Sequence, residues 1–219
     1  MHKHIARLAA TLALLAAASL HAADKIKIGF LSTLSGPSAA IGIDIREGFN
    51  LFAQQNGNKL GGLPIELIYA DDQQNPDIGK QLIERLLKKD RVDLITGIVF
   101  SNVMTAVAPA VFESQTFLVS ANSTPTLYSG EGCSPWFFST SWQNDGAHEA
   151  GGKFVSDKGY NNVVFVAPNY PAGKDAATGF KRFYKGAIAE EVYTKLGQLD
   201  YAAELAQVRA KKPDALYIF

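Results

Sequence analysis

Cysteine is nearly absent from this 219-residue sequence, in which Cys133 is the only one. A single thiol cannot form an intramolecular disulfide, so the fold must be held together by its hydrophobic core. Hydrophobic residues make up 47% of the chain, which is ample for such a core in one large or two small domains. We expect Cys133 to be a buried, unreactive thiol.

Histidine is equally scarce. His2, His4 and His21 lie within the first 23 residues, so the rest of the chain contains only His148. One histidine and one cysteine cannot build a usual zinc site. The acidic run Asp71–Asp77 lacks the spacing of a calcium loop, and we expect its carboxylates to be solvated at a strand end. The sequence therefore predicts no bound metal.

Motifs for nucleotide binding and nucleophilic catalysis are missing as well. The loop "SGPSAAIG" (Ser35–Gly42) follows a strand, but it lacks the lysine of a P-loop and the spacing of a dinucleotide-binding loop. No G-x-S-x-G nucleophile elbow occurs. We therefore expect a protein that is not an enzyme and binds no cofactor.

Neither sign of charge is in excess, because 21 basic residues face 21 acidic ones. Lys3 and Arg7 belong to the N-terminal segment described next, so the remainder is slightly acidic and has no basic block. Nucleic acid and anionic membranes are poor candidate partners on this balance.

Residues 1–23 have the pattern of a secretory signal peptide. Lys3 and Arg7 precede the short uncharged apolar run Leu8–Leu20, and small residues follow at Ala22 and Ala23. The apolar run is shorter than the roughly 20 residues that span a bilayer. We expect cleavage near Ala23 and export of the rest of the chain.

Strand-like and helix-like segments alternate along the rest of the chain. The expected strands are Ile26–Leu31, Ile65–Ala70, Val92–Thr96, Thr116–Ser120, Val163–Ala167, Glu191–Thr194 and Ala215–Phe219. The expected helices are Asp44–Gln55, one that begins at Asn75 and Pro76, Asn102–Glu113, Asp145–Lys158, Lys174–Lys185 and Tyr201–Lys211. This alternation predicts βαβ units and mostly parallel sheets covered on both faces. Pro109 is expected to kink or end its helix.

The alternation is interrupted by the long loop Ala121–Pro135. We therefore expect two α/β lobes, residues 24–136 and 137–219, with the crossover near Trp136–Ser141. The sequence stops on a strand without the elements that would complete a second sheet, so the second lobe is expected to be incomplete.

Hydroxyl-rich loops follow four of the expected strands, at Ser32–Gly42, Phe100–Asn102, Ala121–Thr126 and Pro168–Gly173. In open α/β sheets, ligands bind in the crevice at the carboxyl ends of the strands. Ser101 opens a helix, where it could help to bind an anion or could serve only as an N-cap. Together these loops predict a cleft for a small solute with a polar head group.

Four stretches resemble one family. In chain order they are "IGFLSTLSGPSAAIG", "NGNKLGGLPIELIYADDQQNP", "ITGIVFSNVMTAVAPAVFESQTFLVSANSTP" and "DYAAELAQVRAKKPDALYIF". They resemble the periplasmic leucine/isoleucine/valine-binding proteins, the solute receptors of ABC transporters, from about Lys25 to the last residue. The resemblance implies a type I periplasmic binding protein, with two hinged, doubly wound lobes, no catalytic activity and nearly twice this length.

The resemblance also implies a binding site. The carboxylate-binding serine of the family falls on Ser101, and amino-acid-binding members usually have a tyrosine where this chain has Ala172. The candidate ligand-binding residues are Phe100, Ser101, Asn102, Asn122, Ser123, Thr124, Tyr170 and Ala172. Two features favour an aromatic acid over a branched-chain or other hydrophobic amino acid. The small side chain of Ala172 leaves space in the cleft, and the aromatic side chains of Phe100 and Tyr170 can line it. Trp136 or Trp142 is a further candidate for this lining.

The function implied is a monomeric periplasmic solute-binding protein that delivers a small carboxylate to the membrane permease of an ABC transporter. Two alternatives remain open. A ligand-sensing receptor ectodomain would have the same fold, and a secreted hydrolase is disfavoured by the scarcity of histidine.

Overall fold

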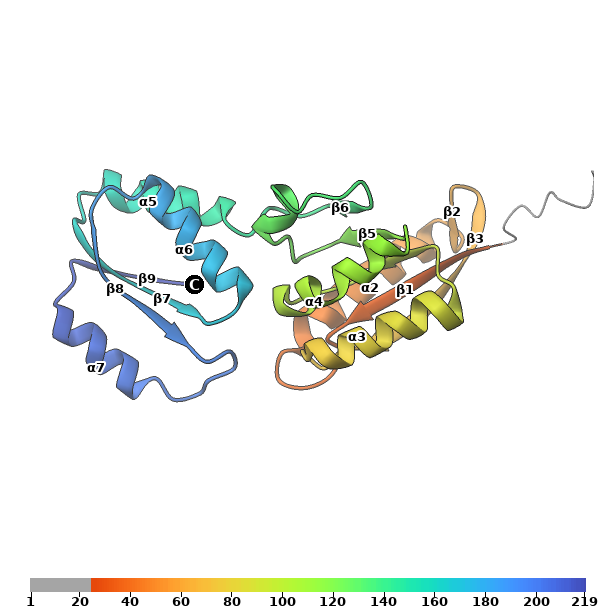
Figure 1. Cartoon of the computed structure of the whole chain (residues 1–219), viewed down its shortest axis with the longest axis horizontal. Coiled ribbons are helices and arrows are strands. Elements are labelled where there is room, and N and C mark those ends of the chain that lie inside the picture. The colour runs from red at the N-terminus through yellow and green to blue at the C-terminus, as the bar shows by residue number, and fades with distance from the viewer. Residues whose placement is uncertain (1–24) are drawn as a thin grey trace, which may run out of the picture.

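The computed structural model describes residues 25–219, which form two α/β lobes arranged along the long axis of the molecule (Figure 1). The expected signal peptide, residues 1–23, lies outside this range. The chain passes from the first lobe to the second between β6 (Phe137–Ser139) and α5 (Gly146–Asp157). None of the helices within residues 25–219 has the length and apolar content needed to cross a membrane.

The first lobe is built on a six-stranded sheet with the order β2-β3-β1-β4-β5-β6. Its strands are β1 (Ile26–Ser32), β2 (Lys59–Leu60), β3 (Leu63–Asp71), β4 (Leu94–Thr96), β5 (Phe117–Ser120) and β6. Every neighbouring pair is parallel except β2 and β3. The carboxyl ends of the parallel strands therefore share one edge of the sheet, where the loops that follow them converge.

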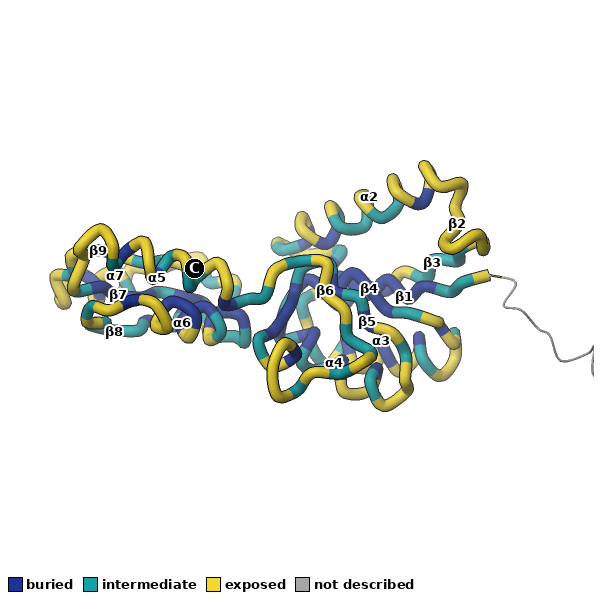
Figure 2. The backbone as a smooth tube through the Cα atoms, turned by 90° about the horizontal axis from the view of Figure 1, so that it is seen from above, coloured by how far each residue is buried: buried dark blue, intermediate teal, exposed yellow. Residues whose placement is uncertain are grey.

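Helices cover both faces of this sheet (Figure 2). Helix α2 (Ala39–Gln55) lies on one face, and α3 (Pro76–Arg85), the π-helical turn η1 (Leu86–Asp90) and α4 (Ser101–Glu113) lie on the other. Strand β1 serves both faces, because Phe30 packs against Phe49 of α2 while its neighbour Leu31 joins the core under α3 and α4. This double burial explains why the central part of the strand, Ile28–Leu31, is apolar.

The second lobe has a three-stranded parallel sheet with the order β8-β7-β9. Its strands are β7 (Asn162–Pro168), β8 (Ala187–Thr194) and β9 (Ala215–Ile218), and its helices are α5, α6 (Pro171–Phe183) and α7 (Ala202–Lys211). Phe165 and Phe180 belong to the core under α5 and α6, whereas Val164 and Val208 pack on the α7 side. The prediction of two α/β lobes with parallel sheets is confirmed.

The predicted crossover near Trp136–Ser141 overlaps the observed connection after Ser139, but the lobe boundary predicted between residues 136 and 137 is too early. Residues 137–139, assigned from the sequence to the second lobe, form β6 and pair with β5 in the first sheet. The first lobe therefore continues through Ser139. Cys133, in the loop before β6, is exposed rather than buried, because its backbone forms a turn at the surface with Gly130.

Two helices begin earlier than predicted, because their first turns contain residues typical of loops. Helix α2 starts at Ala39 rather than Asp44, and Gly42 packs against the carbonyl of Thr33 where a Cβ atom would clash. Helix α6 starts at Pro171 rather than Lys174, with proline at a position that needs no N–H. A small residue thus permits close packing in α2, and a cyclic residue occupies the first helical position in α6.

Helix α4 continues through Pro109, so this proline does not end the helix, and the alternative prediction of a kink stays a prediction. A proline in a helix leaves the carbonyl four residues earlier without its usual N–H partner. That carbonyl belongs to Thr105, and the hydroxyl of Tyr128 donates to it across 3.5 Å. A side chain from outside the helix thus replaces part of the missing bond.

Asp72 is fully buried, against the expectation that the acidic run is solvated. One carboxylate oxygen accepts hydrogen bonds from Thr33 Oγ1 at 2.5 Å and from the N–H of Gln74 at 2.8 Å. Its other oxygen has no hydrogen-bond partner among residues 25–219. Burial raises the pKa of Asp72, an effect that the hydrogen bond from Thr33 opposes.

Candidate functional site

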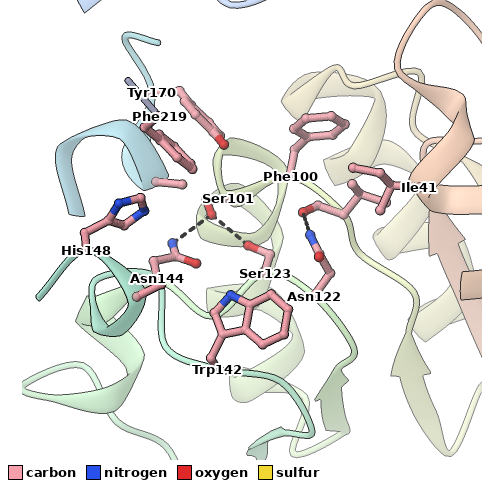
Figure 3. A pocket seen from close by; sticks show the side chains of 13 residues that line it. Ile41, Phe100, Ser101, Asn122, Ser123, Trp142, Asn144, His148, Tyr170 and Phe219 are labelled. Carbon is pink, nitrogen blue, oxygen red and sulfur yellow. Dashed lines mark hydrogen bonds between the residues drawn. The ribbon is translucent and has the colours of Figure 1, made fainter. Parts of the chain in front are cut away.

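A cavity of about 250 Å³ lies between the two lobes, at the carboxyl ends of their strands (Figure 3). The lining residues are Ile41, Val99, Phe100, Ser101, Asn122, Ser123, Trp142, Asn144, Ala147, His148, Tyr170, Ala172 and Phe219. Among these lining residues there is no Asp, Glu, Lys or Arg, and His148 is the one basic side chain.

The first lobe supplies a polar wall. Ser101, the first residue of α4, and Ser123, in the loop after β5, have their hydroxyl oxygens 2.8 Å apart. Both are buried, and the hydroxyl of Ser120 donates to the Ser123 carbonyl at 2.5 Å, which fixes the loop. Asn122 Nδ2 donates to the carbonyl of Val99 at 2.9 Å. Two hydroxyl groups are thus held side by side at the cavity surface.

The helix starts in the cavity wall have no side-chain caps. Helix α4 follows Phe100 and helix α6 follows Tyr170, and neither residue forms a capping hydrogen bond. Of the α-helices described, only α3 is capped by a side chain, that of Asn75, which accepts from two backbone N–H groups; α2, α5 and α7 also lack such a cap, so α4 and α6 are distinguished by their position at the cavity. Uncapped helix starts present N–H groups and the positive end of the helix dipole, which favour an anion.

The second lobe supplies an aromatic wall. The rings of Tyr170 and Phe219 are nearly parallel, with centroids 6.3 Å apart. The His148 ring meets Phe219 edge-on at 4.8 Å. Ala172, buried in the first turn of α6, is the small residue of this wall. Together these residues present apolar surface opposite the hydroxyl groups (Figure 3).

The titratable side chains of the lining are held in their neutral forms. Burial lowers the pKa of His148, although the charge of Asp145 partly opposes this, and His148 Nδ1 lies 2.9 Å from the Tyr217 hydroxyl. Burial, and secondarily the charge of Asp175, raises the pKa of Tyr170. Near neutral pH the side chains of the cavity lining therefore carry no full charge, and they can recognise a charged ligand only through dipoles and hydrogen bonds.

The structure brings together most of the candidate residues. Phe100, Ser101, Asn122, Ser123, Tyr170 and Ala172 line the cavity. Asn102 faces a separate pocket beside Asn169 and Tyr193. Thr124 is buried behind the wall, where its hydroxyl lies 2.6 Å from Ser139 Oγ.

Several lining residues were not among the sequence candidates. Phe219 follows β9, and the rule that ligands bind at the carboxyl ends of strands could have identified it. The same rule could not have identified His148, which lies within helix α5, or Asn144, which lies in the connection between the lobes. Trp142 lines the cavity, whereas Trp136 packs against Phe117 outside it. Within residues 25–219, no cluster of side chains suitable for a metal ion occurs.

Comparison with known proteins identifies similar sequences. A family model described as periplasmic binding protein matches residues 25–219. Leu/Ile/Val-binding protein homolog 6 of Brucella abortus (strain 2308) is 26% identical over 207 residues, which cover 93% of this chain and 53% of the relative. The chain thus spans about half the length of the curated relatives it matches.

Solved structures with this fold include two solute-binding proteins of ABC transporters from R. palustris. The one in complex with benzoate is 28% identical, with a TM-score of 0.84, over 89% of this chain and 55% of that protein. The one in complex with 4-hydroxybenzoate is 29% identical, with a TM-score of 0.82, over 90% of this chain and 54% of that protein.

Proposed function

This chain belongs to the periplasmic binding protein family, and on that premise we propose that it binds a small carboxylate in the cavity between its lobes. It would act as a monomer in the periplasm and deliver the ligand to the membrane permease of an ABC transporter. Its family consists of solute-binding proteins, which agrees with a role in binding rather than catalysis.

The observation that carries this proposal is the pair of uncapped helix starts in the cavity wall, at Ser101 of α4 and Pro171 of α6. Each belongs to a different lobe. An anion placed between them would accept hydrogen bonds from the Ser101 hydroxyl and from backbone N–H groups. It would also hold the lobes together, as expected for closure about the connection between β6 and α5.

An aromatic acid fits the described lining better than an amino acid does. An α-ammonium group needs an anionic or carbonyl partner when it leaves water. No acidic side chain lines the cavity, whereas the rings of Tyr170 and Phe219 offer apolar surface to a flat ligand. The R. palustris proteins in complex with benzoate and 4-hydroxybenzoate support this preference, although curated relatives are named Leu/Ile/Val-binding proteins.

Calorimetric titration of the purified protein tests the proposal. The ligands are benzoate, 4-hydroxybenzoate, leucine and a matched pair, phenylalanine and 3-phenylpropanoate, which differ only in the ammonium group. We expect binding of the aromatic acids and weaker binding of phenylalanine than of 3-phenylpropanoate. Binding of leucine and phenylalanine, with none of the acids, would contradict the aromatic preference; no binding of any ligand would contradict the carboxylate function.

A further inference from the structure

Asn144 connects three parts of the molecule with its side chain. It lies in the connection between β6 and α5, and its Nδ2 donates to Ser101 Oγ at 3.0 Å and to Asp175 Oδ2 at 2.9 Å. Its Oδ1 accepts from the N–H of Thr124 at 3.2 Å, and its own N–H donates to the Thr124 carbonyl at 3.0 Å. Both donors and the acceptor of the amide are therefore used.

Asp175 extends this network into the second lobe. It lies on α6, and the same Oδ2 atom also accepts a hydrogen bond from the N–H of Thr126 at 3.1 Å. Thr126 is at the start of the 3₁₀ turn η2 (Thr126–Ser129) of the first lobe. One carboxylate oxygen of the second lobe thus holds both a backbone group of the first lobe and the amide that contacts Ser101.

We propose that Asp175 and Asn144 form an interlobe latch that positions the hydroxyl group of Ser101 for a ligand carboxylate, an inference that rests on the proposed function. Asp175 does not line the cavity, so it acts through Asn144 rather than on the ligand. Thr124, a candidate ligand contact from the sequence, serves in this latch by fixing Asn144 through two hydrogen bonds.

The latch occupies one acceptor position of the Ser101 hydroxyl oxygen. Because Asn144 donates to the Ser101 oxygen, that oxygen already acts as an acceptor. When the Ser123 hydroxyl donates to Ser101 as well, the Ser101 proton is free to point into the cavity. Ser101 then offers an O–H donor to an anion, and its orientation is set before the ligand arrives.

The ligand-free protein provides the first test, by hydrogen exchange at the amide of Thr126. Asp175→Ala removes the acceptor and should increase this exchange rate at least about fivefold, since a lost bond exposes the amide to local opening. Asp175→Asn should leave it near the wild-type rate, because the amide oxygen can occupy the position of Oδ2. The matched control is Asp214→Ala, which removes a carboxylate that accepts from the N–H groups of Asn161 and Asn162 within the second lobe.

Calorimetric titration with benzoate provides the second test. Asp175→Ala and Asn144→Ala should each weaken binding about tenfold, and the double variant should be no weaker than Asn144→Ala alone. Asp175→Asn and Asp214→Ala should stay within about twofold of wild type. The Asp175→Asn variant separates hydrogen bonding from charge, since removing a negative charge alone would strengthen the binding of an anion.

The two tests have distinguishable failures. Unchanged exchange at Thr126 in Asp175→Ala would overturn the latch. Faster exchange with unchanged benzoate affinity, or additive effects in the double variant, would overturn its role in positioning Ser101. If the wild-type protein binds none of the carboxylates, the proposed function and the positioning role fail together, and the exchange rates alone decide whether the latch exists.

Discussion

The two walls of the cavity differ in kind. The first-lobe wall presents the hydroxyl groups of Ser101 and Ser123 on fixed backbone, and the second-lobe wall presents the rings of Tyr170 and Phe219. Hydrogen bonds require particular directions, whereas burial of apolar surface does not. The hydroxyl groups of the first wall are therefore suited to selecting the head group of a ligand. The rings of the second wall, together with Ile41 and Phe100 of the first lobe, provide contact area for its body.

A change in the polar wall should have the largest effect on ligand affinity. Ser101→Ala should weaken the binding of benzoate about 10- to 100-fold, because a hydrogen bond to a charged group contributes roughly 1.5–3 kcal/mol. Calorimetric titration measures the loss. Ser114→Ala is the matched control, since the Ser114 hydroxyl donates to a carbonyl at the opposite end of α4. Equal affinities of the two variants would mean that the polar wall does not bind the carboxylate.

Filling the space beside Ala172 in the aromatic wall should have the second-largest effect on ligand affinity. Ala172→Leu should weaken aromatic-acid binding about tenfold, because a larger side chain at a packed position costs roughly 1–3 kcal/mol and narrows the cavity. The loss should be larger for 3-phenylpropanoate than for benzoate, as titration with both acids would reveal. Ala150→Leu, at an exposed position of α5, controls for the added side chain. A loss that is independent of ligand size would argue against a role of Ala172 in setting the available space.

The ring of Tyr170 should contribute less. Tyr170→Leu should weaken benzoate binding about threefold, because an aromatic pair adds roughly 0.5–1.5 kcal/mol beyond its buried area. Tyr170→Phe retains the stack on Phe219 and should bind as the wild type does. If Tyr170→Phe loses as much affinity as Tyr170→Leu, the hydroxyl group rather than the ring is the contact, and the second wall is not purely apolar.

The smallest effect concerns pH. The pKa of His148 lies below its usual 6.5 because of burial, so above that pH the imidazole is neutral in both folded and unfolded chains. Below it the unfolded chain takes up a proton before the folded protein does, so the contribution of His148 to the free energy of unfolding falls as the pH falls. His148→Gln should reduce this slope. Urea unfolding at pH 7 and about pH 5.5 measures it in both proteins; equal slopes would mean that His148 is not shielded.

Much of the fold could be predicted from the sequence because the apolar segments are buried on both faces. Strand β1 is an example, with Phe30 and Leu31 packed on opposite sides of the sheet. The placement of Ser101 in the cavity followed from its position after a strand and from the family resemblance. Both signals are local in the chain, and local patterns are what a single sequence displays.

The rest depends on contacts between distant segments. Asn144 enters the site through bonds to residues of both lobes, none of which is near it in the sequence. The burial of Asp72 depends on Thr33, at the end of a neighbouring strand. The start of α2 was also predicted too late, because Gly42 is a residue typical of turns and its role in close packing is visible only in the three-dimensional structure. Pattern alone cannot identify such partners.

Phe219 belongs both to the end of the second sheet and to the cavity wall. Its N–H donates to the Val166 carbonyl of β7, and its ring contacts those of Tyr170 and His148. A ligand that rests on this ring can bind well only when the edge strand is in place. Binding of the ligand and ordering of β9 are then thermodynamically coupled. A ligand at saturating concentrations should therefore raise the melting temperature of the second lobe, and the rise should follow the logarithm of the ligand concentration.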